Sequence, residues 1–158
     1  MKRSAKFETI YRRGQAFARN NEPHKAIRLF GKILQKYPDD TNVLYSNGLC
    51  FMEIEKLNFA ILCFDRILKL NSKAIAVLNK KSRCLLHLEK HDQALACINK
   101  ALKINPRHTD SLGTKVTIFE NSLQFDKAEL EYDKFLDAWR IKYRQFLRNK
   151  KRKLSENV

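Results

Sequence analysis

A repeat period of about 34 residues runs through this chain and restricts it to a repeat architecture. The interval from Cys50 to Cys84 equals the interval from Cys63 to Cys97. Written at this period, the sequence divides without gaps into four units, which are residues 7–40, 41–74, 75–108 and 109–142. Because one such unit cannot bury its apolar face alone, the period predicts a stack of similar units. A basic segment, 1–6, precedes the stack, and a basic extension, 143–158, follows it.

The columns of the repeat predict two helices in each unit. Apolar residues recur at helical spacing in two stretches per unit, and polar connectors separate the stretches. Small residues allow close approach of the paired helices, and large residues fill the space between pairs. The eighth column contains Gly14, Gly48 and Ser82, with Val116 in the fourth unit, and the twenty-fourth contains Phe30, Phe64, Ile98 and Tyr132. We therefore predict an all-α fold, an α-solenoid of four helix-turn-helix repeats. The bulk of Val116 makes close packing of the last pair doubtful.

This pattern resembles the tetratricopeptide repeat. The family signature has small residues in columns 8 and 20, aromatic residues in columns 11 and 24, and proline in column 32. Pro38 and Pro106 occupy column 32, whereas Ser72 and Arg140 replace the proline in units two and four. The resemblance covers 7–142 and implies a protein-interaction module.

The last helix is predicted to continue past residue 142, because no Gly follows Gly113 and no Pro follows Pro106. Apolar residues keep a three-to-four spacing along it, which describes a long amphipathic helix. The stripe consists of Tyr132, Phe135, Leu136, Trp139, Tyr143, Phe146 and Leu147. We expect it to cap the open end of the stack. The alternative is that it docks a partner helix or a second copy of the chain.

The resemblance places a peptide-binding groove on the concave face, formed by the first helix of each unit. Residues in columns 2, 5, 9 and 12 of all four units would line the groove. Apolar side chains of the partner would meet tyrosine, leucine and methionine, and polar groups would meet asparagine and arginine. The candidate groove residues are Tyr11, Gln15, Tyr45, Leu49, Met52, Asn79, Lys80 and Arg83. The alternative is a groove that binds nothing specific.

Heat-shock co-chaperones of this family grip a terminal carboxylate with a clamp of Lys, Asn and Arg. The aligned residues here are Tyr11, Gln15, Ser46, Ala76 and Lys80. Only Lys80 keeps the required chemistry. We therefore expect no specific binding of acidic chaperone tails.

A basic cluster lies at the C-terminal end of the chain. Eight basic residues and no acidic one occur between Arg140 and Lys153. The residues for a polyanion contact are Arg148, Lys150, Lys151, Arg152 and Lys153. The alternatives are a solubilising tail, a nuclear address and an anionic lipid contact.

The sequence does not indicate catalysis, metal binding or cofactor binding. It contains no nucleophile with a base, no spaced carboxylate pair and no phosphate loop. Cys84, His87 and His91 are spaced for one helical face, but His91 lies in a predicted turn and a fourth ligand is missing. We predict a non-enzymatic protein without metal or cofactor.

We interpret the chain as a scaffold or adaptor that binds a peptide or helix of another protein. The net charge of +15 favours acidic partners, but nucleic acid remains an alternative. A second alternative is a secretion chaperone with similar repeats. No segment is apolar enough for a signal peptide or a membrane span, so we expect a cytoplasmic protein, with a nuclear location as the alternative.

Overall fold

The computed structural model describes residues 5–155, with side chains described for 5–149. This part of the chain forms eight α-helices and contains no strand. The helices are α1 (Ala5–Arg19), α2 (Pro23–Lys36), α3 (Thr41–Glu53), α4 (Leu57–Leu70), α5 (Ile75–His87), α6 (His91–Ile104), α7 (Thr109–Asn121) and α8 (Phe125–Ser155).

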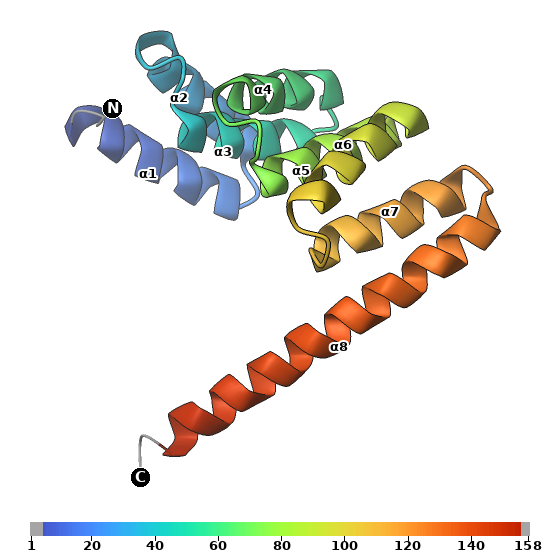
Figure 1. The fold of residues 1–158 in the computed structure, drawn as a ribbon. Coiled ribbons are helices and arrows are strands. Elements are labelled where there is room, and N and C mark those ends of the chain that lie inside the picture. Colours follow the sequence, from blue (N-terminus) through green and yellow to red (C-terminus); the bar gives the residue numbers. More distant parts are fainter. Residues whose placement is uncertain (1–4, 156–158) are drawn as a thin grey trace.

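The helices form a stack of antiparallel pairs (Figure 1). The pairs are α1–α2, α3–α4, α5–α6 and α7–α8, and each second helix also packs against the first helix of the next pair. Equivalent helices begin one repeat period apart, as α3, α5 and α7 do at Thr41, Ile75 and Thr109. The predicted all-α solenoid is confirmed.

The core lies between the helices and follows the predicted columns in the first three units. Phe30, Phe64 and Ile98, from the twenty-fourth column, are completely buried. The fourth unit departs from this pattern. Val116 is buried in the eighth column, and Tyr132 of the twenty-fourth column is 48% exposed. The expectation that Tyr132 fills the core was wrong, because a large residue already stands where the first two units have glycine.

The turns within the units repeat one backbone conformation. Asn21, Glu55, Glu89 and Leu123 occupy the same column of successive units and have φ between 57° and 59°. After each of them, a backbone N–H donates to the carbonyl five residues earlier, as Lys56 N does to Phe51 O at 2.9 Å. This left-handed residue and this hydrogen bond form a Schellman motif, which ends the first helix of every pair.

Helix α8 is 31 residues long and packs mainly against α7. Its second half projects beyond the other helices (Figure 1). The contact with α7 uses a face that includes the buried residues Ala128, Glu131 and Ala138. Most of the predicted apolar stripe lies on another face, where Trp139 and Tyr143 are both 47% exposed, whereas Phe135 of the stripe packs over Gly113 of α7. The expectation that the stripe as a whole caps the stack was therefore wrong.

Candidate functional site

Two hollows open on the face formed by the first helices α1, α3, α5 and α7. The N-terminal hollow has a volume of about 410 Å³ and lies between units one and two. It is lined by Gln15, Ala18, Arg19, Pro23, Phe30, Ser46, Leu49, Cys50 and Glu53. The central hollow has a volume of about 660 Å³ and extends from unit two to unit four. It is lined by Tyr45, Ala76, Asn79, Lys80, Arg83, Leu86, His87, His108, Thr109, Asp110, Gly113, Thr114, Thr117 and Phe135.

Six of the eight predicted groove residues line these hollows. Tyr45, Asn79, Lys80 and Arg83 meet in the central hollow. Gln15 and Leu49 line the N-terminal hollow. The other two, Tyr11 and Met52, are partly buried and line neither hollow.

The two tyrosines have the same structural setting in successive units. The Tyr11 ring contacts Phe30 with centroids 5.8 Å apart, and the Tyr45 ring contacts Phe64 at 6.2 Å. The Tyr11 hydroxyl also hydrogen-bonds the Ser46 hydroxyl at 3.2 Å, which ties α1 to α3. Tyr11 is thus a structural link between units one and two. Tyr45 stands at the wall of the central hollow, and burial raises the pKa of its hydroxyl.

Hydrogen bonds within the chain fix the side chain of Asn79. It is buried, and its Nδ2 donates to Asp110 O at 3.0 Å and to Thr114 Oγ1 at 3.1 Å. These bonds connect α5 to α7. The side-chain amide nitrogen is therefore used within the chain, and Oδ1 is the atom with capacity for a ligand.

Lys80 and Arg83 are the cationic side chains of the central hollow. Lys80 is half-buried and Arg83 exposed, and neither makes an ion pair with any residue that the structure describes. Asp110 lines the same hollow and provides one negative charge. Because an unpaired guanidinium and an ammonium share the hollow, it can accept a carboxylate.

Five residues of the central hollow were not predicted as groove residues, namely His87, His108, Thr109, Thr114 and Phe135. Thr114 and Phe135 lie outside the columns that the resemblance assigns to the groove, and His108 belongs to a connector. His108 caps α7, since its Nδ1 accepts from Ser111 N at 3.3 Å. Phe135 reaches the hollow because it packs over Gly113, where an added Cβ would lie 3.6 Å from the ring. The absence of a side chain at Gly113 was the available signal.

The predicted polyanion residues fall largely outside the described side chains. The backbone of α8 is helical to Ser155, and Arg148 is exposed on it. Lys150, Lys151, Arg152 and Lys153 have side chains beyond the described range. Their role as a contact stays a prediction.

The cysteines and histidines do not form a reactive group. Burial raises the pKa of the Cys50, Cys63 and Cys84 thiols to about 11, so they remain protonated near neutral pH. Within residues 5–149, no three His, Cys, Asp or Glu side chains lie close enough to hold a metal ion. No helix in the described part of the chain has the length and hydropathy needed to cross a bilayer.

Comparison with known proteins identifies the repeat. Two tetratricopeptide repeat models match residues 8–40 and 75–108. No curated protein matches the chain in sequence.

Solved structures with the same fold are more numerous. A crystal structure of MamA has a TM-score of 0.81 and 20% identity, covering 87% of this chain and 81% of that one. MamA 41-end from Desulfovibrio magneticus RS-1 has a TM-score of 0.78 and 19% identity, covering 85% and 76%. At these identities the similarity shows a shared fold.

Proposed function

The chain is a tetratricopeptide repeat protein, and from this premise we propose that it is a scaffold or adaptor module that binds an extended segment of a partner protein. The segment lies along the first-helix face and reaches both hollows. The observation that carries this proposal is the meeting of Lys80, Arg83 and Tyr45 around the central hollow. Stacked repeats use such extended faces to bind partners.

The central hollow is the polar anchor of the proposed site. Arg83 donates to a side-chain or terminal carboxylate of the partner, and Lys80 adds a second positive charge. The ring of Tyr45 supplies an apolar wall beside them. Asp110 disfavours a segment that is acidic throughout, so one carboxylate at this place is preferred over a run of them.

The N-terminal hollow is the apolar anchor. Leu49 lines it together with the buried residues Phe30 and Cys50, which favours an aliphatic side chain of the partner. Glu53 and Arg19 line the same hollow with opposite charges, so the N-terminal hollow attracts a carboxylate less than the central hollow does. The two hollows therefore define a direction for the segment, with its apolar residue at units one and two and its carboxylate at units two to four.

The test is selection of binding peptides from a displayed random library on the full chain. We expect enriched peptides to contain a carboxylate and, several residues away, an aliphatic side chain. Arg83→Ala should weaken their binding by roughly 30-fold, the effect of a hot-spot truncation. Leu49→Ala should weaken it by a smaller factor.

Lys100→Ala is the matched control. Lys100 is exposed on α6 and lines neither hollow, so this variant loses one charge without altering the site. Selected peptides that bind the Arg83→Ala and Leu49→Ala variants as tightly as the parent chain would contradict the groove assignment.

The two alternatives, a polyanion binder and a secretion chaperone, have less support. The first depends on Arg148 and on Lys150, Lys151, Arg152 and Lys153, and the side chains of the last four are outside the described residues. The second has no specific residue to carry it. A cytoplasmic or nuclear location likewise stays a prediction.

A further inference from the structure

An aromatic seam runs along α8. Phe125, Tyr132, Trp139 and Phe146 follow one another at intervals of seven residues. Leu136 and Tyr143 lie four residues after Tyr132 and Trp139. Apolar residues at alternating spacings of four and three form the contact line of a helical coiled coil.

Most of this seam is exposed to solvent. The four aromatic residues at the seven-residue spacing are 62%, 48%, 47% and 59% exposed, in sequence order. The Trp139 and Tyr143 rings already stack on each other, with centroids 5.1 Å apart and planes inclined by 6°. The seam therefore presents ordered aromatic rings to solvent, and solvent exposure of so much apolar surface favours a partner helix.

The charges of α8 divide it into two unlike halves. Residues 125–138 include five acidic and two basic residues, whereas residues 139–155 include eight basic residues and no acidic one. Two parallel copies would place the basic halves side by side, which is unfavourable. Two antiparallel copies would place each basic half beside an acidic half.

From the seam and this charge division, we infer that the chain forms a homodimer by antiparallel pairing of two α8 helices. The inference is independent of the proposed groove function. Antiparallel packing centred between Leu136 and Trp139 brings Leu136 beside Trp139 of the second copy, and Tyr132 beside Tyr143 of the second copy. The same register brings Asp133 beside Arg140 of the second copy, since both follow a seam residue directly.

The charged residues that flank the seam are free to make this contact. Within the described residues Asp133 makes no ion pair. Among the described residues, Arg140 pairs with Asp137 alone, at 3.3 Å, and both side chains are more than half exposed. Such an exposed pair is weak and exchanges readily for an intermolecular one.

The area that this dimer interface would bury is close to the lower limit for a specific dimer. Five half-exposed rings and one leucine per copy would bury roughly 1,000 Å² in total, given about 150–250 Å² for a complete aromatic side chain. We therefore expect a dimer that dissociates in the micromolar range.

Trp139 provides a direct probe, because it is the only tryptophan in the chain. Sedimentation equilibrium of the full chain should show the molar mass rising from monomer to dimer with concentration. The tryptophan emission maximum should shift to shorter wavelength over the same range, as the ring leaves water. Trp139→Ser should keep the helical circular dichroism and stay monomeric.

The pairing direction is tested with charge reversals. Asp133→Arg alone places arginine opposite arginine, and Arg140→Asp alone places aspartate opposite aspartate, so each single variant should dimerise at least tenfold more weakly. A mixture of the two single variants should form heterodimers, and the double variant Asp133→Arg with Arg140→Asp should recover the parent affinity. These recoveries are expected only from the antiparallel register.

Two results would overturn the inference. One is a monomer at every concentration up to several hundred micromolar, including the case where the chain binds anionic lipid vesicles through Trp139 instead. The other is a dimer whose affinity is unchanged by either single charge reversal.

Discussion

The Phe64 ring lies directly on Gly48, so that a Cβ added at residue 48 would be 2.7 Å from Cε1 of that ring. Real Cβ atoms do not approach this closely, and Phe64 is completely buried. The same relationship joins Gly14 and Phe30 in unit one, where the distance would be 2.6 Å. A small residue facing a large one thus sets the spacing of α3 and α4.

Gly48→Ala should destabilise the chain by about 1–3 kcal/mol through overpacking against Phe64. Gly31→Ala is the control, since Gly31 lies within α2 and an added Cβ there meets nothing within 4 Å. That control should stabilise the fold by about 0.5–1 kcal/mol, because alanine favours a helix interior over glycine. Urea unfolding of both variants checks the pair. Equal effects of the two substitutions would contradict the close-contact explanation.

The left-handed turn residues predict stabilising substitutions. Glu55 and Leu123 both have φ of 57°, a conformation that costs a side-chain-bearing residue about 1–2 kcal/mol relative to its right-handed form. Part of this gain is offset by the entropy of glycine in the unfolded chain. We expect Glu55→Gly and Leu123→Gly each to stabilise the fold by about 0.5–1 kcal/mol, measured by thermal unfolding.

Lys100→Gly is the control for these turn substitutions. Lys100 is exposed within α6, where glycine should cost about 0.5–1 kcal/mol. A loss of stability in all three variants would show that the turns gain nothing from glycine.

The repeat made the fold predictable because its signal comes from packing between adjacent units. The predicted place of Leu49 and Arg83 on the first-helix face agrees with the hollows, since column position fixes the helix face. End effects were not predictable in this way. Within residues 5–155 no helix packs on the outer side of the fourth unit, so Tyr132 and Trp139 have no neighbour there to bury them.

The repeat columns also did not predict the hydrogen bonds that side chains make between units. Asn79 was predicted from its column as a binding residue, but its amide nitrogen bonds Asp110 and Thr114 of the next unit. Phe135 of α8 lines the central hollow. The column pattern instead places the second helix of each unit on the convex face of the stack. Contacts between specific atoms of neighbouring helices depend on side-chain conformation, and the repeat period in the sequence does not determine that conformation.

The basic end of α8 predicts weak binding of nucleic acid without sequence preference. Replacing Lys150, Lys151, Arg152 and Lys153 by glutamine should reduce the salt dependence of duplex DNA binding by about 0.9 per lost phosphate contact. Fluorescence titration at several salt concentrations measures this slope.

The control changes the same number of charges elsewhere. Four exposed lysines, Lys32, Lys69, Lys100 and Lys103, replaced by glutamine should alter the slope less than the tail variant does. Absence of DNA binding by the parent chain at low salt would remove the nucleic-acid alternative.

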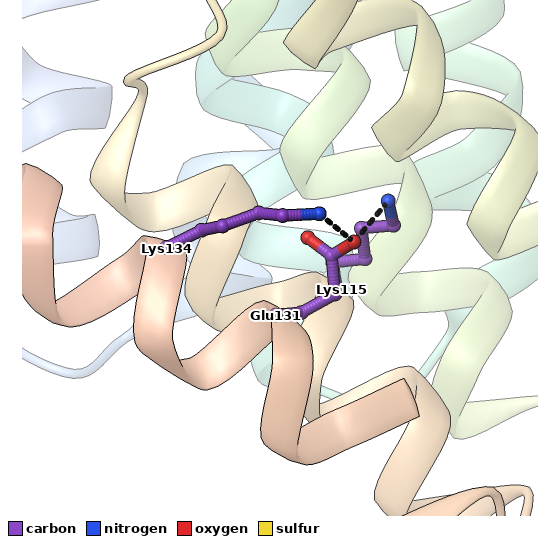
Figure 2. Close-up of polar contacts among 3 residues, drawn as sticks. All are labelled: Lys115, Glu131 and Lys134. Carbon is purple, nitrogen blue, oxygen red and sulfur yellow. Dashed lines mark hydrogen bonds and ion pairs between the residues drawn. The ribbon is translucent and has the colours of Figure 1, made fainter. Parts of the chain in front are cut away.

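A buried carboxylate fastens α8 to α7. Glu131 is only 6% exposed, and its Oε1 accepts from Lys115 Nζ and from Lys134 Nζ, both at 2.9 Å (Figure 2). Burial alone would raise the pKa of Glu131, but the hydrogen bonds and charges of the two lysines outweigh it and leave the pKa below its ordinary value of 4.5. The folded chain therefore binds this proton less tightly than the unfolded chain does.

The Glu131 carboxylate therefore stabilises the fold at pH values above the pKa that Glu131 has in the unfolded chain. This contribution is lost as the pH falls through the lower pKa that Glu131 has in the folded chain. Glu131→Gln should cost about 1–3 kcal/mol at pH 7, because Lys115 is only 17% exposed and loses its charged partner. The difference between Glu131→Gln and the parent chain should shrink when urea unfolding is repeated below pH 4. Lys134→Gln should have a smaller effect at neutral pH, since the Lys134 side chain is 53% exposed. A free-energy difference between Glu131→Gln and the parent that stays constant from pH 7 to pH 3.5 would show that the ion pair does not hold α8 in place.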